Sequence, residues 1–398
     1  MNIAAQLDAL REAGLYRGTR LISGPQGPRV MLDGKPVLLL CSNNYLGFAD
    51  HPRVREAAAE AAMRWGVGAG ASRLVSGTMT VHEQLERALA EFEGTEACVL
   101  FGSGYLANLG VLSALGRAGH TIFSDALNHA SLIDGCRLAR AETFVYDHCD
   151  LDHLAWALRE RGREGDVIVT DSVFSMDGDI APLEGIVALA RRHGALVVVD
   201  EAHATGALGR GGRGAVAAAG LEGEVDVIVG TLSKALGSYG GYVCTRGEIV
   251  ELLLNSARAL IYSTAPPPPA VAGALAALEM LIEQPLRPLK LQSQAAMLRG
   301  ELTAAKVPVA AGDTQIIPLI VGDADAALRF SALALTRGVF AQAIRPPTVP
   351  EGSSRLRLTV MASHTSSELA AAASALSAAA TEAGVRFDAT SAPVARAA

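Results

Sequence analysis

The stretch ALVVVDEAHATG (195–206) decides the fold, together with VDVIVGTLSKALGS (225–238), which follows it. Each opens on a short run of apolar, mostly β-branched residues and then changes to polar and small ones. Such a run predicts a strand that is buried on both faces of a sheet. Similar runs occur at ACVLF (97–101), TIFSD (121–125), ETFVY (142–146), DVIVTD (166–171) and GYVC (241–244). Helical patterns separate them, so we expect a mainly parallel sheet flanked by helices.

The pattern changes at about residue 285. A long polar and apolar helix is followed by strands IIPLIVG (316–322) and RLRLTV (355–360), with a helical pattern between them. We therefore expect an N-terminal segment (1–45), a large domain (46–285), a smaller C-terminal α+β domain (286–385) and a frayed tail (386–398).

The composition excludes several classes of protein. The 398 residues carry 34 Lys and Arg against 41 Asp and Glu, which argues against nucleic acid or an anionic membrane as the main partner. No apolar run reaches the roughly 18 to 20 residues of a membrane span, and the first residues lack a signal-peptide pattern, so we expect a cytoplasmic protein. The five cysteines are scattered and include no C-x2-C pair. This spacing indicates reduced thiols and suggests no metal site.

Polar side chains follow the strands predicted in 195–206 and 225–238. Asp200 and His203 emerge at the carboxyl edge of the predicted sheet, where open α/β folds bind ligands. Lys234 follows the next strand, among hydroxyl-bearing and small residues rather than charged ones. Taken alone, Asp200 and His203 are more commonly a helix cap or a loop contact, and Lys234 is more commonly a surface lysine.

Together these residues predict a cofactor. A lysine that forms a Schiff base and an acid one strand away are the pair that pyridoxal 5'-phosphate (PLP) requires. Asp200 would keep the pyridine nitrogen protonated, and His203 would reach the phenolic oxygen. Thr231 and Ser233 offer hydroxyl groups to the phosphate.

Further residues fit the same interpretation. Gly104 and Tyr105 lie where a strand ends in GSGY (102–105) and a helix begins, so backbone N–H groups there could face a phosphate. A tight turn without a ligand is an equally good reading of this short motif. His129 follows strand 121–125, where its ring could stack on the cofactor or simply cap a helix.

A proline-stiffened turn, RPPTVP (345–350), lies in the C-terminal part of the chain. It would hold Arg345 rigidly enough to grip a carboxylate with both arms of its guanidinium. A solvated arginine beside a stiff loop is the alternative.

At this point the sequence resembles a known family, the α-oxoamine synthases, which are fold-type-I PLP-dependent transferases. The resemblance extends from about residue 36 to 384. It is carried by SNNYLG (42–47), GAGASRLVSG (68–77), FGSGYLAN (101–108), NHASL (128–132), TDSVFSMDGDIAPL (170–183), VDEAHATGALGRGGRG (199–214), TLSKALGS (231–238) and LIYSTAPPP (260–268).

The resemblance implies a fold and a set of roles. The fold is a large α/β domain with a mainly parallel sheet flanked by helices, plus a smaller C-terminal α+β domain, in a homodimer with a shared active site. Lys234, His129 and Asp200 would be catalytic. The cofactor would be bound by Lys234, Asp200, His203, Ser175, Thr231, Gly104, Tyr105 and His129. The substrate would be bound by Arg345, Thr348, Asn43 and Arg17.

The substrates are indicated by the resemblance of one segment to a single branch of the family. The segment AIRPPTVPEGSSRLRLT (343–359) is similar to the branch of the family that joins L-alanine to a pimeloyl thioester, of CoA or acyl carrier protein, in biotin biosynthesis. The chain would then be a decarboxylating acyltransferase. Sister branches that make aminoketobutyrate, a sphingoid base precursor or a long-chain amino ketone are the alternatives.

Two other classes are disfavoured. A nucleotide-binding dehydrogenase would need a full G-x-G-x-x-G motif with an acid about 20 residues later, and the chain lacks that arrangement. A non-catalytic scaffold of the same fold would be expected to have lost Lys234 or Asp200, and both are present.

Overall fold

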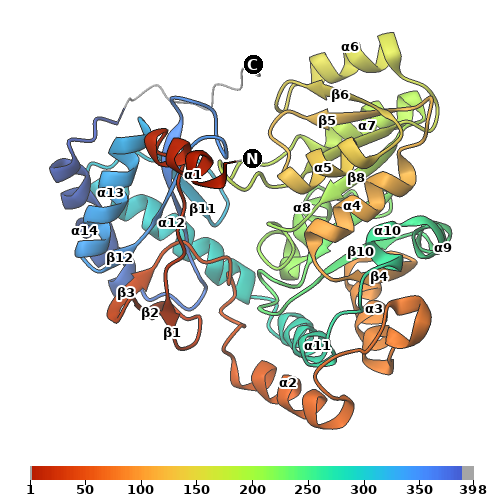
Figure 1. Ribbon diagram of the computed structural model, residues 1–398, viewed down its shortest axis with the longest axis horizontal. Coiled ribbons are helices and arrows are strands. Elements are labelled where there is room, and N and C mark those ends of the chain that lie inside the picture. Colours follow the sequence, from red (N-terminus) through yellow and green to blue (C-terminus); the bar gives the residue numbers. More distant parts are fainter. Residues whose placement is uncertain (1, 388–398) are drawn as a thin grey trace.

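The computed structural model describes residues 2–387 and contains a large and a small lobe (Figure 1). The predicted tail therefore lies almost wholly outside the described residues. Within the described part, no helix combines the length and the apolar character needed to cross a membrane.

The large lobe is built on a seven-stranded sheet in the order β4-β10-β9-β8-β7-β5-β6. Its strands are β4 (Ala97–Phe101), β5 (Thr121–Asp125), β6 (Glu142–Tyr146), β7 (Val167–Asp171), β8 (Leu196–Asp200), β9 (Val227–Thr231) and β10 (Gly241–Thr245). Strands β6, β5, β7, β8 and β9 pair in parallel, whereas β10 runs antiparallel to both β9 and β4. The predicted mainly parallel sheet is confirmed.

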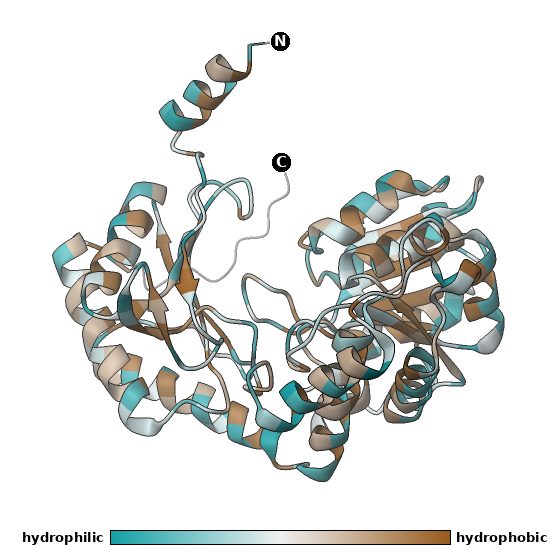
Figure 2. Cartoon of the chain, turned by 60° about the horizontal axis from the view of Figure 1, so that its bottom comes forward, coloured by the Kyte–Doolittle hydropathy of each residue, from teal (hydrophilic) through white to brown (hydrophobic). Residues whose placement is uncertain are grey.

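Alternate residues of these strands enter two different cores. Val198 and Val229 pack with helices on one face of the sheet, whereas Val197 and Val199 pack with helices on the other. Both faces are covered, which explains why the strand sequences are continuously apolar. Figure 2 shows the apolar strands enclosed by helices on both sides.

The helices of the large lobe lie before, between and after these strands along the chain. They are α2 (Pro52–Trp65), η1 (Arg73–Gly77), α3 (Thr80–Glu93), α4 (Gly104–Leu115), α5 (Ala130–Leu138), α6 (Leu151–Arg161), α7 (Leu183–His193), η2 (Arg210–Gly212), α8 (Gly214–Ala218), α9 (Gly247–Ser256), α10 (Arg258–Ile261) and α11 (Pro268–Glu283). Helix α7 ends at Gly194, which has a positive φ of 66° and donates its N–H to Ala190. Glycine adopts this left-handed conformation without a steric penalty, as the sequence pattern predicts.

The small lobe combines two sheets with three long helices. The antiparallel sheet β11-β14-β13 consists of β11 (Ile316–Gly322), β13 (Gln342–Ile344) and β14 (Ser354–Thr359). The second sheet, β1-β2-β3-β12, consists of β1 (Ile22–Ser23), β2 (Arg29–Leu32), β3 (Lys35–Leu39) and β12 (Val339–Phe340). The helices are α12 (Arg287–Ala304), α13 (Ala324–Thr336) and α14 (Ser366–Ala383).

The N-terminal segment contributes strands β1, β2 and β3 to the small lobe. Strand β3 pairs in parallel with β12, about 300 residues later in the chain. Helix α1 (Ile3–Glu12), in contrast, has no buried residue and projects from the body in Figure 2. The domain boundaries stay a prediction, and the N-terminal segment is divided between strands that pack and a helix that does not.

Candidate active site

Three acidic or basic residues meet at the carboxyl edge of the large sheet. Asp171 ends β7 and lies opposite Asp200, which ends β8. Strand β9 pairs in parallel with β8 and leads into the loop that carries Lys234. The predicted meeting of Asp200 and Lys234 at one edge follows from this register.

Lys234 is partly buried, and its Nζ lies 2.8 Å from Nε2 of His203. Burial lowers the pKa of Lys234 to about 8, although the negative charges of Asp200 and Asp171 oppose the shift. A substantial fraction of this amine is therefore neutral near neutral pH. A neutral amine is the form that attacks an aldehyde or accepts a proton.

A chain of hydrogen bonds extends from this amine, and we call it the lysine network: Lys234, His203, Tyr45, Asn43 and Arg357. Nδ1 of His203 lies 2.7 Å from the Tyr45 hydroxyl, which lies 3.1 Å from Oδ1 of Asn43. Both terminal nitrogens of Arg357 donate to the same Asn43 oxygen at 3.3 Å.

The direction of the protons in this network can be assigned. Burial, followed by the charge of Lys234, holds the pKa of His203 well below its usual value, so its ring is neutral. Asn43 Oδ1 can only accept, so the single proton of the Tyr45 hydroxyl is donated to it. His203 must then donate from Nδ1 to Tyr45, which leaves the lone pair of Nε2 facing Lys234.

Asp200 is buried and fixed by two donors. Its Oδ2 accepts from Nδ2 of Asn108 at 2.6 Å, and its Oδ1 accepts from the backbone N–H of Ala202 at 2.8 Å. Burial and the charge of Asp200 raise the pKa of Asp171 well above its usual value. The two carboxyl groups therefore disfavour ionisation of each other at this edge of the sheet.

His129 lies beside this pair as the N-cap of α5. Its backbone N–H donates to Oδ2 of Asp171 at 2.6 Å, and its Nδ1 lies 2.7 Å from the Ser131 hydroxyl. Solvent reaches the residue, yet the surrounding protein desolvates the ring enough to lower its pKa, against the pull of Asp200. A neutral ring in this position can lie against a flat ligand.

An anion cradle lies at the start of α4. Ser103 caps the helix by accepting from the N–H of Leu106, and a side chain at Gly104 would meet Cβ of Thr231 at 3.4 Å. The free amides of this helix end therefore adjoin the Thr231 hydroxyl, as a phosphate requires. Tyr105 follows on the helix, and its exposed hydroxyl donates to Asp134.

The residues present fit PLP. A lysine with a lowered pKa, a buried carboxyl group, a neutral histidine at the Lys234 amine and a helix terminus beside a hydroxyl occupy one edge of the sheet. This donor set suits an aldehyde, a pyridine nitrogen, a phenolic oxygen and a phosphate.

The remaining predicted residues lie farther out. Arg345 donates to the backbone carbonyls of Gly14 and Tyr16, and Arg17 donates to the Thr348 hydroxyl at 3.2 Å. We call this set of bonds the Arg345 contact. None of these bonds reaches the lysine network, so a role for these residues with substrate stays a prediction.

Ser175 lies between the lysine network and the Arg345 contact. Its backbone carbonyl accepts from Nε of Arg357, and its loop and Thr348 line one small cavity of about 80 Å³. Its hydroxyl can therefore face a ligand from the side of the small lobe.

The sequence analysis missed Arg357, Asn108, Tyr45 and Asp171. Arg357 is buried on β14, where its charge lowers the pKa of both Lys234 and His203. An arginine in the middle of an apolar strand needs a buried partner, and this was the available signal. Asn108 was similarly recognisable as a polar residue in the apolar helix pattern 104–115.

The chain was compared with known proteins. The family model described as aminotransferase class I and II matches residues 35–376. A protein of Citrifermentans bemidjiense named 8-amino-7-oxononanoate synthase is 52% identical, with 93% of this chain and 96% of that protein covered. A protein of the same name from Geobacter sulfurreducens is 49% identical, with 96% and 99% covered.

The fold is also similar to that of a solved enzyme. A structure of SPT, serine palmitoyltransferase, with PLP has a TM-score of 0.91 and 34% sequence identity. The alignment covers 96% of this chain and 98% of that one. The fold-type-I architecture expected from the sequence is thereby confirmed.

Proposed function

Because this chain belongs to the aminotransferase class I and II family, and within it to the 8-amino-7-oxononanoate synthases, we propose that it condenses L-alanine with a pimeloyl thioester in biotin biosynthesis. The identity to proteins of that name over nearly the whole chain is the observation that carries this proposal. The enzyme is a PLP-dependent acyltransferase.

Groups on the large lobe would hold the cofactor. Lys234 would bind its aldehyde, Asp200 its ring nitrogen, and His203 and Ser175 would lie near its phenolic oxygen. His129 would pack against the ring, while Gly104, Tyr105 and Thr231 would surround the phosphate. When bound, PLP supplies an electron sink for the electron pair left on the alanine Cα.

The reaction replaces one carbon substituent of Cα by another. The Cα–carboxylate bond breaks with loss of CO2, a bond from Cα to the acyl carbon forms, and the thioester C–S bond breaks with release of a thiolate that takes a proton from solvent. Lys234, whose lowered pKa makes its neutral form accessible, accepts the Cα proton and later returns one. Because His203 Nε2 accepts from Lys234 Nζ, it orients the nitrogen lone pair for this transfer.

Alanine needs a cation for its carboxylate, and two arginines are candidates. Arg357 is buried beside Asn43 within the lysine network, whereas Arg345 donates to the N-terminal segment. We propose that Arg357 and Asn43 hold the carboxylate. Arg345, Thr348 and Arg17 contact the acyl side of the substrate pair.

An assay with paired substrates tests the proposal. Purified enzyme with PLP is incubated with L-alanine, glycine or L-serine and with pimeloyl-CoA or pimeloyl-acyl carrier protein. We expect 8-amino-7-oxononanoate and CO2 from alanine at a rate well above the other amino acids. Turnover with glycine or serine, and none with alanine, would reject it.

One second function has a specific observation in its favour. The likeness to the SPT structure, at a TM-score of 0.91, supports a serine-using α-oxoamine synthase with a long-chain thioester. The glycine-using 2-amino-3-ketobutyrate CoA ligase reaction is a further sister activity. The same assay distinguishes all three.

The site also suggests an assembly. Three large apolar side chains near η1, those of Leu74, Val75 and Tyr262, are 54%, 79% and 72% exposed, and a β-bridge between Ser72 and Thr264 holds the two segments together. We propose that they are covered in a homodimer with a shared active site, and that this dimer is cytoplasmic. Analytical ultracentrifugation and cell fractionation check the two points.

A further inference from the structure

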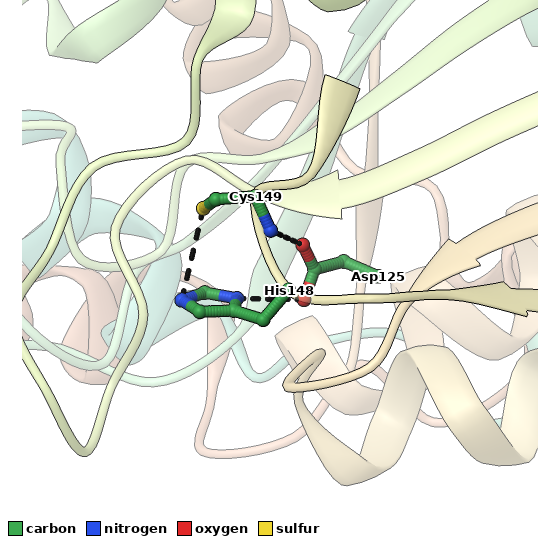
Figure 3. A group of neighbouring side chains, drawn as sticks. All are labelled: Asp125, His148 and Cys149. Atoms are coloured by element: carbon green, nitrogen blue, oxygen red, sulfur yellow. Dashed lines mark hydrogen bonds and ion pairs between the residues drawn. The ribbon is translucent and has the colours of Figure 1, made fainter. Parts of the chain in front are cut away.

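A second cluster of metal-ligating side chains lies outside the active site. Asp125 ends β5, His148 and Cys149 follow β6, and Asp179 lies in the loop after β7. Figure 3 shows Asp125, His148 and Cys149 turned toward one another. The mechanism above uses none of these side chains.

We propose that His148 Nε2, Cys149 Sγ and an Asp179 carboxylate oxygen bind one zinc-like divalent cation. Nε2 lies 2.7 Å from Oδ2 of Asp179 and 3.7 Å from Sγ, and Sγ lies 4.0 Å from the same oxygen. In a tetrahedral zinc site with bonds of about 2.0–2.3 Å, such ligands stand roughly 3.3–3.6 Å apart. Each pair in this structure is within about 0.7 Å of that spacing.

Asp125 orients the histidine for such a site. It is buried, and its Oδ1 lies 2.9 Å from Nδ1 of His148. The same carboxylate accepts from the N–H groups of Leu127 and Cys149, both at 2.8 Å. Metal-bound histidines commonly donate their second nitrogen to a carboxylate in this way, which directs Nε2 at the ion.

Both ring nitrogens of His148 face carboxylates, because Nδ1 lies 2.9 Å from Oδ1 of Asp125 and Nε2 lies 2.7 Å from Oδ2 of Asp179. An ion would replace the hydrogen bond on the Nε2 side and leave the bond to Asp125 in place.

The ligand set selects the metal and leaves a route for its entry. One thiolate, one imidazole and one carboxylate suit zinc better than magnesium or calcium, which prefer oxygen ligands. The Asp179 side chain is 33% exposed and lines a cavity of about 310 Å³. Its Oδ1 is buried and has no hydrogen-bond partner among residues 2–387, so a free acceptor is available.

No local sequence pattern indicates this site, because its ligands come from separate loops. The parallel pairing of β6, β5 and β7 brings the ends of these strands together. A bound ion would connect residues 148–149 to the loop that carries Ser175 and Asp179. The site is independent of the proposed function, because it includes no group that contacts PLP or substrate.

Zinc titration of the PLP-loaded enzyme, after removal of metal with a chelator, tests the proposal. Isothermal calorimetry should show one tight site per chain. Cys149→Asn is the informative variant, because Cys149 has a positive φ of 55° that asparagine tolerates. We expect Cys149→Asn and Asp179→Asn each to weaken zinc binding by at least about 10²-fold. Cys41→Ala, at the other half-buried thiol, serves as the matched control and should leave binding unchanged.

Cobalt(II) supplies a second readout that needs no comparison of stabilities. Bound to the wild-type cluster, it should show the visible bands of a tetrahedral ion and a thiolate charge-transfer band, and Cys149→Asn should lose the latter. Zinc should also raise the thermal midpoint of the wild type and not that of the variant. Equal zinc affinity in the wild type and Cys149→Asn, or a wild type without a tight site, would show that the cluster is only an ion-paired histidine.

Discussion

The lysine network and the Arg345 contact are both made of hydrogen bonds between distant parts of the chain, but they are supported differently. The network joins buried or half-buried side chains on β14, on the segment after β3 and on the loops after β8 and β9. The Arg345 contact joins an exposed turn to a segment whose helix α1 has no buried residue. The groups proposed to bind the cofactor are therefore fixed by the fold itself, whereas the outer groups contact a segment whose helix has no buried residue.

The first prediction concerns the centre of the network. Replacing Lys234 by Ala removes the amine proposed both to anchor PLP and to act as the base, so turnover should fall at least about 10³-fold. The PLP absorbance of the purified protein should be lost with it. Lys290→Ala, on α12, is the control, and a Lys234→Ala enzyme that keeps a tenth of its activity would contradict the assignment.

Two arginines of one strand sharpen the comparison. Arg357→Lys keeps the charge but loses the two-armed donor, so kcat/KM for alanine should fall about 10²-fold, mainly through KM. Arg355, two residues earlier, pairs with Asp177. Arg355→Lys should lower the thermal midpoint and leave the alanine KM nearly unchanged. Equal kinetic losses in both variants would remove the special role of Arg357.

The pKa of Lys234 makes a prediction about pH. In cofactor-free protein the fraction of Lys234 in its neutral form increases about tenfold per pH unit up to about pH 8 and then levels off. The rate of PLP uptake should follow this fraction. The charge of Asp200 raises this pKa, so Asp200→Asn should move the midpoint to lower pH. Asp152→Asn, at an exposed site on α6, should not. Stopped-flow absorbance measures both, and an unmoved midpoint in Asp200→Asn would disprove the coupling.

The smallest effect is expected for the exposed residues of the Arg345 contact. Arg17 and Thr348 are both exposed, and contacts of this kind contribute about 1 kcal/mol or less, so Arg17→Ala should raise the thioester KM by no more than about fivefold. Thr348→Val should raise the thioester KM by a similar factor. A loss as large as that of Arg357→Lys would show that the N-terminal segment is as firmly part of the site as the network.

The same contrast explains what the sequence could predict. Asp200 and Lys234 each follow a buried strand directly, so periodicity located them, and parallel pairing brought them together. Arg357 depends on the packing of β14 against the large lobe, which no local pattern encodes. The pairing of β3 with β12 is equally distant in sequence, and the antiparallel direction of β10 depends on a hairpin whose turn residues gave no clear signal.

The orientation of β10 has one more consequence for Lys234. Thr231, the last residue of β9, pairs with Gly241, the first of β10, so residues 232–240 form a loop closed at both ends by a strand pair. A loop held in this way loses most of its conformational entropy during folding rather than during the reaction. The Lys234 amine therefore reacts with a bound molecule at a high effective molarity, as in an intramolecular reaction between two groups of one small molecule.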